Sequence, residues 1–237
     1  MRQSGLALLN YEGAHQRFPS GWRTYDPSFP IDDPGWGWSA TILPFMDGQN
    51  IHSQIEFNMP IDDPSHVEII KTPIPVFLCP SDPAPEIVNI GPHDHDDELM
   101  VGRSNYSGVF GSTEIEDGPD KGNGAFFANS ELKLSEFTDG LSNTMIVGER
   151  RNDFGTISWV GAVAEVDDSP LRIVGVADHG PNDPGGNFED FRSYHPAGIN
   201  VVLGDGSVHF VSNSIDEDIF RALATRNGGE VASIAND

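Results

Sequence analysis

Cysteine and positive charge are both scarce in this sequence. Cys79 is the single cysteine among 237 residues, so an internal disulfide and a multi-cysteine zinc site are excluded. Lysine and arginine together number 13 against 37 acidic residues, which gives a formal net charge of −24. Such a chain repels phosphate backbones and anionic lipids, so nucleic-acid binding is not expected. The surplus of carboxylates makes Ca²⁺ a candidate cofactor.

Long hydrophobic runs are also lacking. The opening residues 1–9 are too short and too broken to span a bilayer or to act as a full signal peptide. Hydrophobic residues make up 37% of the chain, which also contains 26 glycines and 18 prolines, and this composition predicts a modest core with long loops. The length fits a single domain over residues 1–237.

The pattern of apolar and turn residues divides that domain into three regions. Residues 1–16 are typical of the end of an N-terminal helix. Residues 17–98 contain many prolines and are predicted to be loop-rich, with short helices. Residues 99–237 are predicted to form an antiparallel sheet that ends in a hairpin and a C-terminal helix.

Several segments have the β-branched and aromatic content of strands, with Gly, Asn and Asp turns between them. The predicted strands are 76–78, 106–110, 125–134, 144–147, 156–163, 171–176, 199–203 and 207–211. The last two form the clearest hairpin in the chain, with Asp205-Gly206 as its two-residue turn. Ser214 and Glu217 have capping-box spacing and predict the start of the final helix. The expected fold class is therefore α+β.

The hairpin carries a histidine followed by Asp-Gly, namely His195 and Asp205-Gly206. Other short motifs occur in a fixed order along the chain: Leu6 to Tyr11, Phe18-Pro19-Ser20-Gly21, Trp38 to Pro44, Leu78-Cys79-Pro80-Ser81, Ser104-Asn105-Tyr106, and Asp139-Gly140-Leu141-Ser142-Asn143-Thr144 to Gly148-Glu149. Together they resemble the planctomycete-type DUF1559 family, which has prepilin-type N-termini and a so-called H-X9-DG C-terminal domain.

The resemblance implies a pilin-like fold, in which an N-terminal helix packs on an antiparallel sheet that carries long loop insertions. It also implies export to the cell envelope, periplasm or cell surface. Expected partners are other pilin-like subunits or components of a type II secretion or type IV pilus system. The prepilin cleavage site and apolar helix that precede residue 6 in the family are not in the printed sequence, so the chain is either shortened or a member without its anchor.

His195 and Asp205 invite a catalytic interpretation, with Ser193, Ser207 or His209 completing a hydrolase-like set. The sequence contains no Gly-x-Ser-x-Gly nucleophile elbow. We therefore expect no catalytic residue here. His195 is instead predicted to lock the hairpin by donating to a carbonyl or a carboxylate.

Asp139, Gly140, Ser142, Asn143 and Thr144 are expected to satisfy the backbone of a tight turn before a strand. Glu149 and the arginines after it resemble an ion pair at a strand end. Cys79 is expected to be a small buried residue with no base nearby.

Two loops offer metal ligands. His93, His95 and Asp96 supply imidazole and carboxylate groups of the kind that hold transition metals. Glu116, Asp117 and Asp120 supply oxygen ligands for Ca²⁺, although their spacing does not match an EF-hand.

These observations predict a non-enzymatic, pseudopilin-like structural or interaction protein of the cell envelope. The alternative is a calcium- or other metal-dependent extracellular binding module of the adhesin type. A hydrolase built around His195 ranks third.

Overall fold

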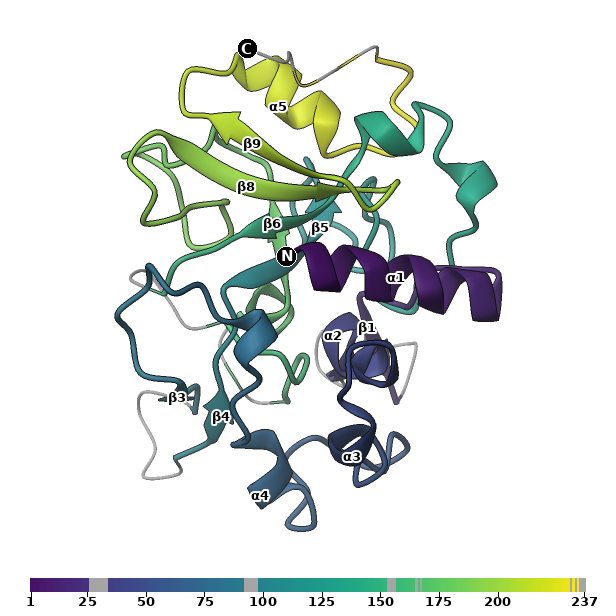
Figure 1. The fold of residues 1–237 in the computed structure, drawn as a ribbon, viewed down its shortest axis with the longest axis vertical. Coiled ribbons are helices and arrows are strands. Elements are labelled where there is room, and N and C mark those ends of the chain that lie inside the picture. Colours follow the sequence, from purple (N-terminus) through teal and green to yellow (C-terminus); the bar gives the residue numbers. More distant parts are fainter. Residues whose placement is uncertain are drawn as a thin grey trace.

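A five-stranded mixed sheet with the strand order β7-β5-β6-β8-β9 forms the centre of the fold (Figure 1). The computed structural model describes residues 1–25, 34–91, 98–152, 157–164, 166, 168–230, 232 and 234. The sheet strands are β5 (Tyr106–Gly111), β6 (Met145–Glu149), β7 (Val174–Val176), β8 (Gly198–Leu203) and β9 (Val208–Ser212). Neighbouring strands run antiparallel except β5 and β7, which pair in parallel.

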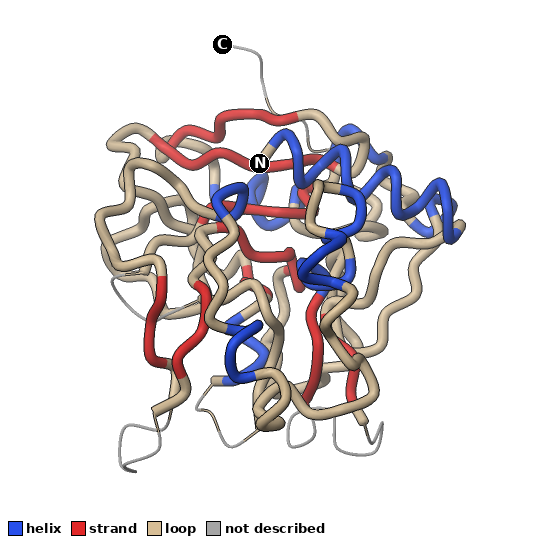
Figure 2. Tube along the Cα trace, turned by 60° about the horizontal axis from the view of Figure 1, so that its bottom comes forward, coloured by secondary structure: helices blue, strands red, loops and turns tan. Residues whose placement is uncertain are grey.

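Short elements surround this sheet. Two small hairpins form from β1 (Trp22–Thr24) with β2 (Pro34–Gly37) and from β3 (Ile87–Asn89) with β4 (Met100–Gly102). The helices are α1 (Arg2–His15), α2 (Trp38–Thr41), α3 (Gln49–His52), α4 (Val67–Ile70) and α5 (Glu217–Leu223). Figure 2 shows how much of the chain is loop, as the glycine and proline content predicts. None of the described helices has both the length and the apolarity to cross a membrane.

The two faces of the sheet belong to different hydrophobic clusters because successive residues of a strand point to opposite faces. On β8, Val202 joins the cluster that contains Ala7 and Leu8 of α1. Val201 and its neighbours on the same face join a second cluster with Phe220 of α5. Helices α1 and α5 therefore cover opposite faces of the sheet.

The expected α+β class, with an N-terminal and a C-terminal helix, is confirmed. Trp22, Trp36 and Trp38 of the loop-rich region are all buried. The final helix begins later than predicted, because Asp216 rather than Ser214 is its N-cap and accepts hydrogen bonds from the backbone of Asp218 and Ile219.

Three of the predicted strands are wrong or largely wrong. Residues 75–77 form a 3₁₀ turn, because Pro75 fixes a turn conformation at its start. In 125–134, Asn129 adopts a left-handed φ of 52°, which ends the extended run. In the described part of 156–163, Gly161 has a φ of 149° and only isolated bridges form.

Candidate functional site

His195 and Asp205 lie at opposite ends of β8. The six residues of that strand separate them by about 20 Å at the usual rise per residue. The two signature residues therefore belong to two different clusters, which we call the His195 end and the Asp205 end of the hairpin.

At the Asp205 end, residues 204–207 join β8 to β9, in place of the predicted two-residue turn. The Gly206 N–H donates to the Leu203 carbonyl, and the Leu203 N–H donates to the Ser207 carbonyl. Gly206 has a φ of 79°, as expected where a left-handed residue follows a turn. This geometry explains why glycine occupies the position.

The Asp139 to Thr144 segment packs directly against this loop. The Asp205 N–H donates to the Leu141 carbonyl and the Gly204 N–H to the Thr144 carbonyl. Burial opposes ionisation of Asp205, but hydrogen bonds from Ser207 and Ser142 outweigh it and lower the pKa of the carboxyl.

The other members of this segment support the backbone around it. The side chain of Asn143 donates to the Asp139 carbonyl, and the Thr144 hydroxyl donates to the Gly140 carbonyl. The Asp139 carboxylate accepts the N–H groups of Gly228 and Gly229 at 2.7 and 3.0 Å, and so ties down the segment after α5.

A hydroxyl, an imidazole and a carboxylate do meet at the Asp205 end. Ser207 Oγ lies 2.5 Å from Asp205 Oδ1 and 2.9 Å from His209 Nε2. A hydrolase triad needs the histidine between the hydroxyl and the carboxylate, whereas here the hydroxyl is in the middle. The order of the groups therefore does not fit the hydrolase interpretation.

At the His195 end, three side chains from distant segments converge. His195 Nε2 lies 3.4 Å from Glu149 Oε1 and 3.8 Å from Cys79 Sγ. Cys79 and Glu149 are 8% and 3% exposed. His195 thus contacts a carboxylate, and Cys79, though buried as predicted, has the nearby imidazole that the sequence did not reveal.

Glu149 is held from the neighbouring strand. The backbone N–H of Asn200 donates to Glu149 Oε2 at 2.7 Å, and its side-chain amide contacts both carboxylate oxygens at 3.1 and 3.2 Å. Of the two arginines predicted to pair with Glu149, Arg150 does not pair with it. Arg150 is buried and donates to the carbonyls of Leu171 and Val174 instead, and burial lowers its pKa.

A buried polar network lies beside Cys79. Asn105 Oδ1 accepts the Cys79 N–H at 2.8 Å and Arg103 Nη1 at 2.7 Å, while its amide donates to Asp82 at 2.6 Å. Arg103 and Asp82 also form an ion pair of 3.0 Å. This network joins the segment after residue 78 to the start of β5.

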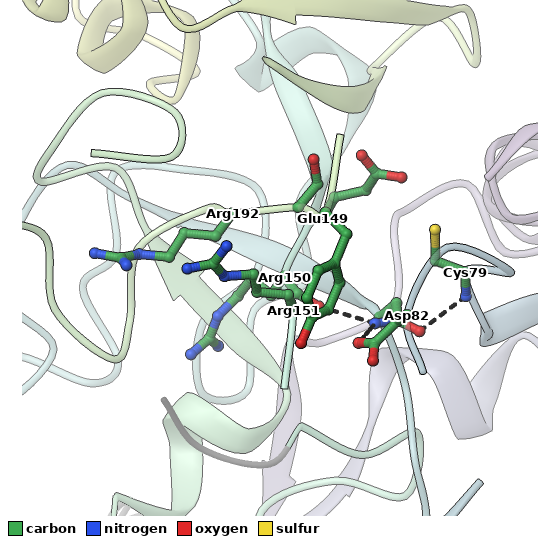
Figure 3. A pocket seen from close by; sticks show the side chains of 9 residues that line it. Cys79, Asp82, Glu149, Arg150, Arg151 and Arg192 are labelled. Carbon is green, nitrogen blue, oxygen red and sulfur yellow. Dashed lines mark hydrogen bonds between the residues drawn. The ribbon is translucent and has the colours of Figure 1, made fainter. Parts of the chain in front are cut away.

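A small pocket opens next to these groups, lined among others by Cys79 and Glu149. Figure 3 shows Arg150, Arg151 and Arg192 at one end of it and Cys79 with Asp82 at the other. Burial lowers the pKa of the Met1 amino group, while Glu149 and Cys79 act in the opposite direction.

Of the metal ligands predicted from the two loops, the described ones do not lie at this site. His93, His95 and Asp96 lie outside the described residues. Glu116, Asp117 and Asp120 are exposed and do not form the ligand cluster found among the described residues, which is Cys79, Glu149 and His195. Calcium binding at Glu116 to Asp120 stays a prediction.

Comparison with known proteins now gives the family. A family model described as "Protein of unknown function (DUF1559)" matches residues 1–218. The chain belongs to the DUF1559 family. No curated protein and no solved structure matches it.

Several of the DUF1559 segments that were recognised in the sequence assemble at the two ends of one hairpin. The Asp139 to Thr144 segment meets Asp205-Gly206, while the segments around Cys79, Asn105 and Glu149 meet at the His195 end. Asn200, which orients Glu149, was missed. An asparagine inside an otherwise apolar strand was the one signal that could have pointed to it.

Proposed function

We propose that this DUF1559 chain is a non-enzymatic, pilin-like structural subunit, exported and displayed at the cell envelope by a type II secretion or type IV pilus system. Its partners are other pilin-like subunits or components of that system. The hairpin is a structural framework, and the loops supply contacts.

The observation that carries this proposal is the packing of α1. One side of the helix is buried through Ala7, Leu8 and Tyr11, and Gly5 lets it approach Val202 and the backbone of Gly206. The other side is free, with Leu6 54% exposed. A helix fixed on a sheet by one side can present its other side to neighbouring subunits.

Gly206, at the turn of the hairpin, also supports this packing of α1. A Cβ at Gly206 would lie 2.6 Å from Leu9 Cδ1, so the signature loop is shaped to receive α1. The signature thereby supports the position of the helix, which a structural subunit needs and which requires no chemistry at His195.

Disulfide crosslinking in the native host tests the proposal. The chromosomal gene would carry Cys79→Ser together with Leu6→Cys, so that the only thiol lies on the exposed side of α1. Mild oxidation of intact cells should give crosslinked species in the envelope fraction.

Cys79→Ser with Ile87→Cys is the matched control. Ile87 is 39% exposed but lies on the β3–β4 hairpin, away from α1 (Figure 1). Equal crosslinking of both variants, or monomer alone with Leu6→Cys, would contradict a subunit contact through α1.

A further inference from the structure

We infer that Cys79, Glu149 and His195 form a binding site for a transition-metal dication, with Zn²⁺ the best match. The inference is independent of the proposed function, because a structural subunit and a binding module could both use such a site. It rests on the spacing of the three ligand atoms, on their charge and on the groups that hold them.

Two of the three separations are close to the edge lengths of a coordination tetrahedron. Bonds of about 2.0 Å from zinc to N or O and about 2.3 Å to S place neighbouring ligand atoms about 3.3 to 3.6 Å apart. The observed separations from His195 Nε2 are 3.4 Å to Glu149 and 3.8 Å to Cys79, and all three ligand atoms lie within 4.8 Å of one another. The Cys79 and Glu149 ligand atoms, which lie within 4.8 Å of each other, would have to approach by up to about 1.3 Å to complete the geometry.

Hydrogen bonding explains the cluster less well. The nitrogen of His195 faces both the carboxylate and the sulfur, and its 3.4 Å distance to Glu149 exceeds the usual N–H···O range of about 2.7 to 3.2 Å. One ring N–H cannot serve two acceptors well. A shared cation between the three groups would satisfy all of them.

Charge and ligand type favour zinc over calcium. A dication with one thiolate and one carboxylate is neutral overall, which suits ligands that are 8% and 3% exposed. Sulfur and imidazole ligands select zinc and similar metals, whereas Ca²⁺ takes oxygen ligands.

The ligands are held from outside, as in built metal sites. Asn200 fixes the carboxylate of Glu149 through its backbone and side chain. The backbone N–H of Cys79 donates to the Asn105 side chain, and the backbone N–H of His195 donates to the Ser193 hydroxyl. Three protein ligands beside a cavity leave the fourth position for water or a small ligand.

Metal titration of the purified protein, free of any polyhistidine tag, tests the inference. We expect one Zn²⁺ per chain by isothermal titration and a higher melting temperature with Zn²⁺ than with EDTA. Co²⁺ should give the near-ultraviolet absorption of a thiolate–cobalt bond. His195→Ala and Cys79→Ser should each weaken binding at least about 100-fold, and Asn200→Ala about tenfold.

His179→Ala is the matched control, because His179 also lies beside two carboxylates, those of Asp178 and Asp190. It should bind Zn²⁺ like the parent protein. The inference is overturned if wild-type protein binds no Zn²⁺, if its Co²⁺ complex lacks the thiolate band, or if His179→Ala abolishes binding while His195→Ala does not.

Discussion

Asp82 and Arg103 form an ion pair that is almost fully removed from water, with side chains 1% and 3% exposed. Asn105 bonds to both partners and also to the backbone of Cys79. Burial would raise the pKa of Asp82, but its hydrogen bonds and Arg103 outweigh burial and lower it. The network therefore keeps the carboxylate ionised and fixes the segment that bears Cys79.

Replacing Asp82 should be severe, because Arg103 would keep a buried charge without its partner. Asp82→Ala should lower the free energy of unfolding by about 3 to 5 kcal/mol, measured by urea denaturation. Glu131→Ala removes the exposed pair with Arg17 and should cost about 1 kcal/mol or less. Similar losses in both variants would contradict the role given to burial.

His179 should make stability depend on pH. Burial opposes its charge, but Asp190 and Asp178 outweigh burial and raise the pKa of the imidazole. A raised folded-state pKa stabilises the fold at pH values below the unfolded pKa of about 6.5, and this contribution is lost as pH rises through the folded pKa. His179→Asn should therefore lower the melting temperature more at about pH 5.5 than at about pH 8.5. If the difference in melting temperature between the parent protein and His179→Asn stays constant or grows as the pH rises, the pairing of His179 with Asp190 and Asp178 is contradicted.

At the scale of elements, α1 packs closely on the turn of the hairpin. Gly206→Ala places a methyl group at a φ of 79° and against Leu9, whereas Gly229→Ala meets a φ of 83° with no neighbouring atom within 4 Å. Both substitutions strain the backbone, but only the first also forces a side chain of α1, that of Leu9, to move. Gly206→Ala should therefore destabilise the protein by about 1 to 3 kcal/mol more, as measured in urea. Equal effects would show that the contact with α1 contributes little.

Local patterns predicted the elements whose signals are local. The β8–β9 hairpin has strand-forming residues on both sides of an Asp-Gly turn, and α5 has an apolar face, so both were found from the sequence. Residues 125–134 have the composition of a strand, but their backbone bonds go to single distant partners such as Val109. Composition alone cannot reveal such pairing.

The sequence indicated individual residues of the candidate site, but not which of them lie together in the fold. His195 was expected to contact a carbonyl or a carboxylate, yet nothing near it in the sequence indicated Glu149 or Cys79. The grouping depends on the β6–β8 register, in which Gly148 pairs with Val201 and brings Glu149 to Asn200. Long-range register is a property of the folded sheet.

At the scale of the molecule, the net charge of −24 should oppose compaction. Raising NaCl from about 0.02 to 0.5 M should therefore raise the melting temperature by screening. If screening is the whole effect, replacing NaCl by CaCl₂ at the same ionic strength should not raise the melting temperature further. A larger shift with Ca²⁺ than with Mg²⁺ would instead favour the calcium-dependent binding module.

The most direct test of the central claim is the location of the protein in the cell that encodes it. An epitope would be placed in the native chromosomal gene, and intact cells would be treated with protease before fractionation. We predict an envelope-associated protein that is accessible to protease and that loses this location when the prepilin peptidase gene is deleted. A protein that stays in the cytoplasm, protected from protease and unaffected by the deletion, would contradict the account.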